Sequence, residues 1–204
     1  MLYNESSIVV LEGLEAVRQR PKMYVGDTGQ GGLNKLIAEL VGNAVGEVTE
    51  GHATTIRVHL KGDSLMVEDD GRGIPVDLNR SYGMSPLEVI FTSLNSGCNC
   101  GCDEPAGHRV GDAGVGVSVV NALSAWLDVE TVRDGHLHRI GFTQGRVTHA
   151  LEDLGATERK GTRVTFALDR TVFELEVALD TPWLEEHLRE LPLGDLGSVD
   201  LTRE

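Results

Sequence analysis

The sequence predicts an α+β fold, a two-layer α/β sandwich in which helices cover one face of a mixed, mostly antiparallel sheet. Three observations predict it. A long segment with apolar residues at helical spacing is followed directly by a β-hairpin, and several more strand candidates separated by short turns occupy the second half of the chain. The 204 residues are enough for one domain, residues 1–204, whose core needs no disulfide or metal.

The composition is that of a folded, water-soluble protein, with 40% hydrophobic and 25% charged residues. The formal net charge of −14 repels phosphate backbones, so we expect no duplex DNA binding by this chain alone. The sequence lacks a run of about 18 apolar residues, and it begins without the basic and apolar regions of a signal peptide. We therefore expect a cytoplasmic protein with no membrane partner.

The chain before the hairpin is predicted to be mainly helical. Residues 1–7 are polar and are expected to form an amino-terminal arm, and Ile8 to Arg18 fits a short helix. Residues 20–27 are predicted to form a turn. The long helix then runs from Gly32 to Thr49, and the following Gly51 is of the type that ends helices.

The hairpin consists of Thr55–Leu60 and Ser64–Glu68, which alternate apolar and polar residues, and it leads into the segment 69–75. Ser85-Pro86 is a helix cap followed by a first-turn proline, and we expect a helix from there to Leu94. Residues 95–114 have no apolar period and are predicted to form a lid-type loop.

The remaining elements follow from apolar patterns divided by glycine turns. A short helix is expected from Val115 to Leu123 and a capped amphipathic helix from Thr181 to Leu191. Between these helices lie the strand candidates, which are Leu127–Val132, His136–Thr143, Arg146–Leu151 and Thr162–Leu168.

One stripe of the long helix is polar. Glu39, Asn43 and Glu47 lie at positions i, i+4 and i+8 and therefore on one side of the helix. A carboxylate, an amide and a second carboxylate in a row are typical of a catalytic face. A solvated helix edge has the same pattern.

Two glycine-containing segments are candidate ligand sites. In the segment 69–73, the carboxylate of Asp69 can accept a hydrogen bond from an exocyclic amine, and its glycines allow a planar ligand to approach closely. The segment 111–116 opens a helix and can offer free N–H groups to phosphates. A plain turn after a hairpin and a plain loop-to-helix joint are the alternatives. The order of these segments along the chain carries more information than either alone.

In the order of these segments, the chain resembles the amino-terminal ATPase domain of DNA gyrase B and its topoisomerase IV counterpart. Both belong to the GHKL superfamily of ATP-binding domains. The resemblance covers nearly the whole chain. It is carried by Leu14-Glu15-Ala16-Val17-Arg18, Arg20-Pro21-Lys22-Met23-Tyr24-Val25-Gly26-Asp27-Thr28, Glu39 with Asn43-Ala44, residues 69–75 (Asp-Asp-Gly-Arg-Gly-Ile-Pro), residues 114–124 (Gly-Val-Gly-Val-Ser-Val-Val-Asn-Ala-Leu-Ser) and Gly161-Thr162.

The resemblance implies the Bergerat fold and a role for each matching residue. Glu39 would be the general base for the attacking water and Asn43 a Mg²⁺ ligand, with ATP as substrate. Asp69 would bind the adenine amine, directly and through a water shared with Thr162. The other implied ATP-site residues are Glu47 paired with Arg72, Gly71, the wall residues Gly73, Ile74 and Pro75, Arg133 at the mouth, and Gly111, Gly114, Val115, Gly116 and Val117 at the lid.

The chain departs from the family pattern at the catalytic helix and the lid. Glycines Gly42 and Gly46 stand where the family has acids, and Lys35 stands where it has a histidine. Lys35 either screens Glu39 or points into solvent. The lid is shortened, and it contains Val110-Gly111-Asp112-Ala113-Gly114 in place of Gly-Gly-Leu-His-Gly. We therefore expect weak hydrolysis.

The sequence also ends with the nucleotide domain and shows no transducer, Toprim or DNA-gate part. We expect a divergent, stand-alone ATPase domain and not a complete topoisomerase. A non-hydrolysing adenine-nucleotide switch or partner module, and a related fold with another substrate, are the alternatives. Tyr3 matches the dimer-arm tyrosine of the gyrase pattern, so a homodimer through the amino-terminal arm is a candidate assembly.

All three cysteines, Cys98, Cys100 and Cys102, lie in the predicted lid with His108 nearby. Alternate spacing can direct their sulfur atoms to one side of an extended loop, which would suit Zn²⁺ or Cu⁺. An exposed loop that has accumulated cysteines is the alternative.

Overall fold

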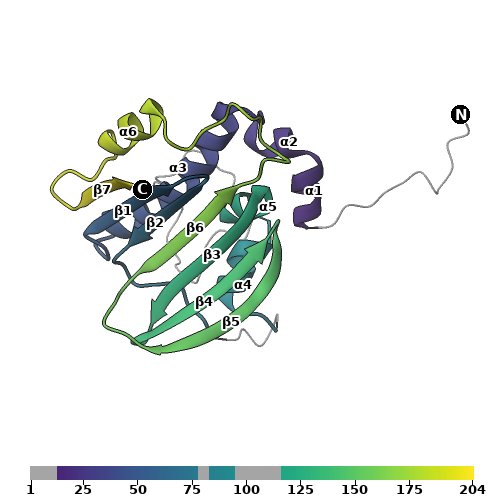
Figure 1. Ribbon diagram of the computed structural model, residues 1–204. Coiled ribbons are helices and arrows are strands. Elements are labelled where there is room, and N and C mark those ends of the chain that lie inside the picture. Colours follow the sequence, from purple (N-terminus) through teal and green to yellow (C-terminus); the bar gives the residue numbers. More distant parts are fainter. Residues whose placement is uncertain (1–12, 78–82, 95–115) are drawn as a thin grey trace, which may run out of the picture.

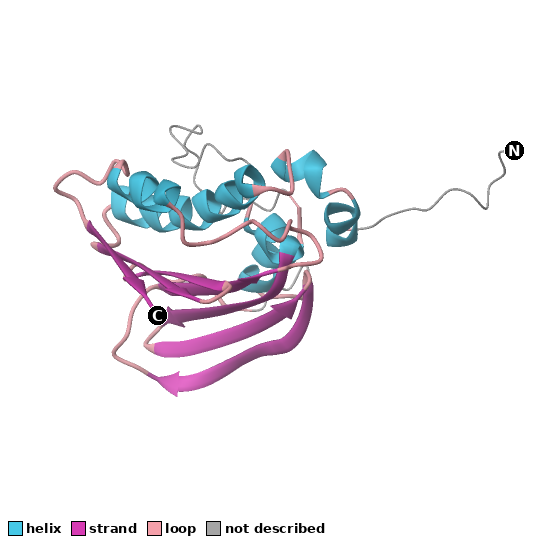
Figure 2. Ribbon diagram, turned by 45° about the horizontal axis from the view of Figure 1, so that its top comes forward, coloured by secondary structure: helices cyan, strands magenta, loops and turns pink. Residues whose placement is uncertain are grey.

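The computed structural model describes residues 13–77, 83–94 and 116–204, which form a seven-stranded sheet with helices packed on one face (Figures 1 and 2). The strand order is β5-β4-β3-β6-β2-β1-β7. All neighbouring strands are antiparallel except β1 and β7, which are parallel. The predicted α+β class, with a mixed and mostly antiparallel sheet, is confirmed.

The helices and strands have the following bounds. The helices are α1 (Leu14–Gln19), α2 (Pro21–Val25), α3 (Gln30–Thr49), α4 (Pro86–Thr92), α5 (Val117–Leu123) and α6 (Pro182–Arg189). The strands are β1 (Thr55–Lys61), β2 (Ser64–Asp69), β3 (Ser124–Arg133), β4 (His136–Thr143), β5 (Arg146–Ala156), β6 (Thr162–Leu168) and β7 (Ser198–Arg203).

The core lies between α3 and the sheet. Apolar residues of α3 repeat at helical spacing and are buried, among them Leu33, Leu36, Ile37 and Leu40. On the sheet, the apolar members of each alternating strand face them. Phe91 of α4 stacks on Phe142 of β4 with ring centroids 5.8 Å apart and extends the core toward β5.

Helix caps read from the sequence are present. The Ser85 hydroxyl accepts a hydrogen bond from the Glu88 amide at the start of α4, and the Thr181 hydroxyl accepts one from Leu184 at the start of α6. In both helices a proline follows the cap, where its missing N–H costs no hydrogen bond.

Two elements differ from the prediction. Residues 20–27 were expected to form a turn, but Pro21–Val25 is a short helix that ends in the Gly26 amide bonding to the Lys22 carbonyl. Five residues are too few to show an apolar period. Strand β7 was not predicted, because only its half-buried Val199 and Leu201 face the protein at this edge of the sheet.

The sheet face opposite the helices carries a charge ladder. Its members are cross-strand partners, one from each strand, and their signs alternate: Asp200, Arg57, Glu68, Arg163, Glu130, Arg139 and Glu152. Figure 2 shows that no helix covers this face. Opposite charges directly across from each other stabilise neighbouring strands. The sheet face that no helix covers therefore carries charged residues whose signs balance one another.

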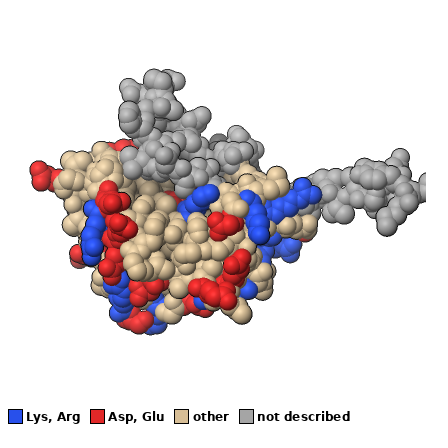
Figure 3. Space-filling view, turned by 90° about the horizontal axis from the view of Figure 1, so that it is seen from above, with Lys and Arg blue, Asp and Glu red and all other residues tan. Residues whose placement is uncertain are grey.

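Charged residues also mix on another side of the molecule. In the view of Figure 3, acidic and basic side chains lie next to one another around the rim of a largely uncharged area. The excess of acids over bases in the whole chain is therefore not gathered into one patch on that side.

Candidate functional site

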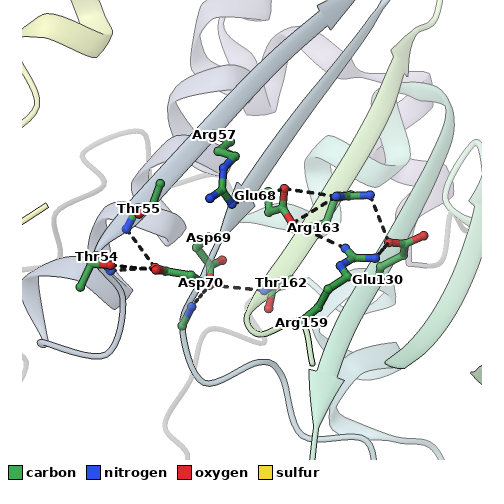
Figure 4. Close-up of polar contacts among 11 residues, drawn as sticks. Thr54, Thr55, Arg57, Glu68, Asp69, Asp70, Glu130, Arg159, Thr162 and Arg163 are labelled. Atoms are coloured by element: carbon green, nitrogen blue, oxygen red, sulfur yellow. Dashed lines mark hydrogen bonds and ion pairs between the residues drawn. The ribbon is translucent and has the colours of Figure 1, made fainter. Parts of the chain in front are cut away.

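The carboxyl end of β2 places a buried carboxylate beside the first residue of the neighbouring strand β6. Asp69 is 7% exposed, and its Oδ1 accepts hydrogen bonds from the Gly71 amide at 2.9 Å and the Thr162 amide at 3.3 Å (Figure 4). Burial raises the pKa of Asp69 to about 6, although the two amides lower it. A buried carboxylate held by two amides is an acceptor that is positioned for a further donor.

Two glycines allow the segments at this end of the sheet to cross closely. A Cβ at Gly161 would collide with the Asp69 carbonyl oxygen, and one at Gly73 would collide with the Val132 carbonyl oxygen. Both residues also have positive φ angles, 81° and 72°. The Asp-x-Gly-x-Gly segment therefore lies directly against the ends of β3 and β6, and the glycines permit this close backbone crossing.

A further residue, Thr131, belongs to this site and was not identified from the sequence. It is fully buried, and its Oγ1 accepts a hydrogen bond of 2.7 Å from the Ile74 amide. The same oxygen lies 3.4 Å from Oγ1 of Thr162, its partner across β3 and β6. The sequence did contain a signal for this residue: Thr131 continues the inward-facing alternation of Leu127 and Val129, at a position where an apolar residue is usual.

The polar stripe of α3 approaches the same site at its carboxyl end. Glu47 bonds to Arg72 through the guanidinium, at 2.7 and 3.2 Å, and through the backbone amide at 3.1 Å. Burial raises the pKa of Glu47, but the bonds and charge of Arg72 outweigh it and hold that pKa below its usual value. The pairing of Arg72 with Glu47 that the resemblance implied is therefore present.

Glu39 and Asn43 lie two turns and one turn earlier on α3. Glu39 is half-buried and Asn43 is exposed. The helix continues without interruption through Gly42 and Gly46. Lys35 is exposed and its Nζ lies beside Gly26, so its position agrees with the solvent-directed alternative.

The other predicted site residues that the structure describes lie near these contacts of Asp69 and Arg72. Nη1 of Arg133 donates to the Arg72 carbonyl at 3.4 Å, and the Pro75 carbonyl accepts from the Leu87 amide at 3.3 Å. Gly116 precedes α5 with a φ of 77°, and Val117 is the first residue of that helix. The predicted residues Gly111, Gly114 and Val115 lie outside the described residues.

The predicted thiolate cluster, Cys98, Cys100 and Cys102, also lies outside the described residues, as does the arm with Tyr3. Within residues 13–77, 83–94 and 116–204, no group of three or more His, Cys, Asp and Glu side chains is arranged to hold a metal ion. Over the same residues, none of the helices has the length and hydropathy needed to cross a bilayer.

Two surface cavities of about 520 and 580 Å³ lie elsewhere. One is lined by α6 and β7, and the other by α1, Thr92 and the turn between β4 and β5. Neither contains a predicted site residue. The candidate site is therefore defined by its buried polar contacts.

Comparison with known proteins identifies the fold family. The family described as "Histidine kinase-, DNA gyrase B-, and HSP90-like ATPase" matches residues 28–172, which is more than half of the chain. The chain belongs to this family. Its described site, with Asp69 at the strand end and Glu39, Asn43 and Glu47 on one helix, thus occurs in a gyrase B-like ATPase domain.

Individual members of the gyrase B-like group are similar over almost the whole chain. DNA gyrase B of Thermus thermophilus is 48% identical over 196 residues, which cover 94% of this chain and 30% of the relative. DNA gyrase B of Thermotoga maritima is 46% identical over 93% of this chain and 30% of the relative. The corresponding DNA topoisomerase 4 protein of Staphylococcus aureus is 44% identical over 92% of this chain and 28% of the relative.

A solved structure agrees with these relatives. The 43K ATPase domain of Thermus thermophilus gyrase B, crystallised in complex with an aminocoumarin, superimposes with a TM-score of 0.80 and 41% identity, covering 93% of this chain and 48% of that one. The chain spans just under a third of the length of the curated relatives that it matches.

Proposed function

We propose that this gyrase B-like domain binds ATP at Asp69 and hydrolyses it slowly in a Mg²⁺-dependent reaction with Glu39 as the general base. The observation that carries the proposal is the buried Asp69 carboxylate, which receives only backbone amides in the described structure and has a pKa raised to about 6. A perturbed carboxylate at such a site is typical of a functional group.

Asp69 suits the exocyclic amine of adenine. At neutral pH, above a pKa of about 6, the carboxylate is mostly ionised and accepts hydrogen bonds without donating any. The glycines Gly73 and Gly161 let the backbone segments beside Asp69 cross closely, because a Cβ at either position would collide with a carbonyl oxygen. The family pattern assigns Asp69 to the adenine amine and Gly73 to the wall of the adenine pocket.

The stripe on α3 supplies the remaining chemistry. Glu39 takes a proton from water while the water oxygen bonds to the γ-phosphorus and the bond to the β-phosphate oxygen breaks, giving ADP and phosphate. Asn43 is exposed one turn along, and its amide oxygen is a ligand of the kind that Mg²⁺ prefers. A bound Mg²⁺ would stabilise charge on the transferred phosphoryl group.

The expectation of slow turnover follows from Gly42 and Gly46. Both lie on α3 beside Asn43, where the family has acids, and acids behind a metal ligand typically contribute about 10–100-fold in activity. A Cβ at Gly46 would have no heavy atom within 4 Å, so the structure has room for an acid there.

The test is single-turnover hydrolysis of ATP with Mg²⁺, beside calorimetric ATP binding. We expect Glu39→Gln to reduce hydrolysis by about 100-fold or more and to leave ATP affinity within about threefold, since the amide keeps the volume but is not a base. Glu186→Gln, at an exposed position of α6, is the matched control and should change neither hydrolysis nor affinity. Equal hydrolysis in Glu39→Gln and wild-type protein would refute the assigned base.

A non-hydrolysing nucleotide switch is the second candidate, and the loss of acids at Gly42 and Gly46 favours it. The double substitution Gly42→Asp with Gly46→Asp separates the two. If supporting acids limit turnover, hydrolysis rises by about tenfold or more. Binding of ATP by the wild type without turnover supports the switch. No binding by the folded protein contradicts both and leaves another substrate as the alternative.

A further inference from the structure

We propose that Thr131 is a positioning residue that sets the preference for adenine over guanine by orienting the hydroxyl of Thr162. The inference rests on the proposed ATP site and adds the origin of its base selectivity. Thr131 and Thr162 are direct cross-strand partners on β3 and β6, and their Oγ1 atoms lie 3.4 Å apart.

The direction of the hydrogen bond between the two threonines follows from the contacts of Thr131. Its Oγ1 accepts the Ile74 amide at 2.7 Å, so one lone pair is occupied and the hydroxyl proton is available for donation. The side chain is fully buried, and a buried hydroxyl is costly unless its proton has an acceptor. Among the described contacts, the acceptor is Oγ1 of Thr162.

The hydroxyl of Thr162 is thereby oriented as a donor toward the ligand. Thr162 uses its backbone amide to reach Asp69, at 3.3 Å, and its hydroxyl oxygen accepts from Thr131. Its own proton then points to whatever occupies the site. A chain of donors runs from the Ile74 amide through Thr131 to Thr162, and a bridging water would pass the same polarity to a ligand.

The result is a donor, Thr162, next to an acceptor, Asp69. Adenine presents the opposite pair on its Watson–Crick edge, with an amine donor on C6 and an acceptor at N1. Guanine presents an acceptor on C6 and an N–H donor at N1, so both of its groups would face like groups. Sites that hydrogen-bond a ligand discriminate strongly, because an unmatched buried group remains unpaired.

The test measures ATP and GTP affinity by calorimetry, together with 1-deaza-ATP, which lacks the N1 acceptor. Thr131→Val removes the hydroxyl but keeps the volume, and Thr131→Ser keeps the hydroxyl. Thr165→Val is the matched control, because Thr165 lies on β6 beside Met66 and Asp128 on the open sheet face. Melting temperatures report on folding.

We expect wild-type protein to prefer ATP over GTP, and Thr131→Val to reduce this preference by about fivefold or more, as for one net hydrogen bond. The affinity loss from ATP to 1-deaza-ATP should shrink in Thr131→Val, since the N1 contact depends on the oriented donor. Thr131→Ser and Thr165→Val should match the wild type within about twofold. A merely structural role for Thr131 would lower all three affinities equally.

The inference is overturned if Thr131→Val keeps both the ATP-to-GTP preference and the 1-deaza penalty while ATP still binds. That result would leave the proposed function intact, whereas absence of ATP binding by folded wild-type protein would refute the proposed function itself. If Thr131→Val does not fold, Thr131→Cys serves instead, because its thiol is a weak donor and acceptor. Unchanged selectivity in Thr131→Cys would also overturn the inference.

Discussion

Glu68 and Asp69 are consecutive residues of β2 with almost equal burial, 9% and 7% exposed, but they face opposite sides of the sheet (Figure 4). On the open face, Glu68 lies against three guanidinium groups. These belong to Arg163 at 3.2 Å, Arg159 at 3.5 Å and Arg57 at 3.9 Å. On the helix face, the described hydrogen bonds to Asp69 come from two backbone amides.

The difference distinguishes a carboxylate in an ion-pair network from one that we propose is functional. Cations around Glu68 offset the cost of burying its charge, and Arg159 and Arg163 link it onward to Glu130. Among the described residues, no cation pairs with Asp69, and burial raises its pKa to about 6 although two backbone amides lower it. At similar burial, Glu68 is surrounded by cations whereas Asp69 is held by backbone amides, and Asp69 is the acid that we propose binds a ligand.

The largest expected effect is on nucleotide binding by Asp69→Asn. The substitution keeps the shape and removes the charge that would accept the adenine amine. A hydrogen bond to a charged group contributes about 1.5–3 kcal/mol, so ATP affinity should fall by about 10–150-fold. Calorimetric titration measures this, and an affinity within twofold of wild type would contradict the assignment.

The same substitution should stabilise the fold in a pH-dependent manner. Because its folded pKa of about 6 exceeds the ordinary 3.8, Asp69 contributes stability below pH 3.8 that is lost as pH rises through 6. At pH 8, Asp69→Asn should therefore raise the free energy of unfolding by about 1–3 kcal/mol. The gain should vanish near pH 4. Denaturant unfolding at both pH values tests the sign, and a loss of stability at pH 8 would contradict it.

A smaller and opposite effect is expected for Glu68→Gln. Removing this charge leaves three arginines facing one another without their shared acid, and their partial exposure limits the cost to about 1–2 kcal/mol of unfolding free energy. ATP affinity should stay within twofold, because Glu68 points away from the site. The comparison fails if Glu68→Gln weakens ATP binding as much as Asp69→Asn.

Sequence patterns were sufficient to predict those elements whose signal lies in neighbouring residues. The apolar period of α3, the caps Ser85 and Thr181, and the alternation of the β1–β2 hairpin are all read from neighbouring residues, and each agrees with the structure. The gyrase-like motifs also predicted the pairing of Glu47 with Arg72, which the structure contains. These signals depend on residues close in sequence or on a family pattern.

Features that depend on strand order could not be predicted. The contacts of Glu68 with Arg163 and of Thr131 with Thr162 exist because β6 lies between β2 and β3, although β6 is later in the chain than either. The parallel edge strand β7 returns to β1 from the far end of the sequence. Nothing in the local pattern at Thr131 indicates which residue its hydroxyl would reach.

We propose that the ligand site of this domain lies at Asp69 and not on the open sheet face. The most direct measurement is an amide NMR titration of the wild-type protein with ATP and Mg²⁺. We predict saturable shifts of the Gly71, Ile74 and Thr162 amide resonances, with Arg57, Glu130 and other charge-ladder residues unaffected. Shifts confined to the charge ladder, or no saturable shift of the folded protein, would show that ATP does not bind at Asp69.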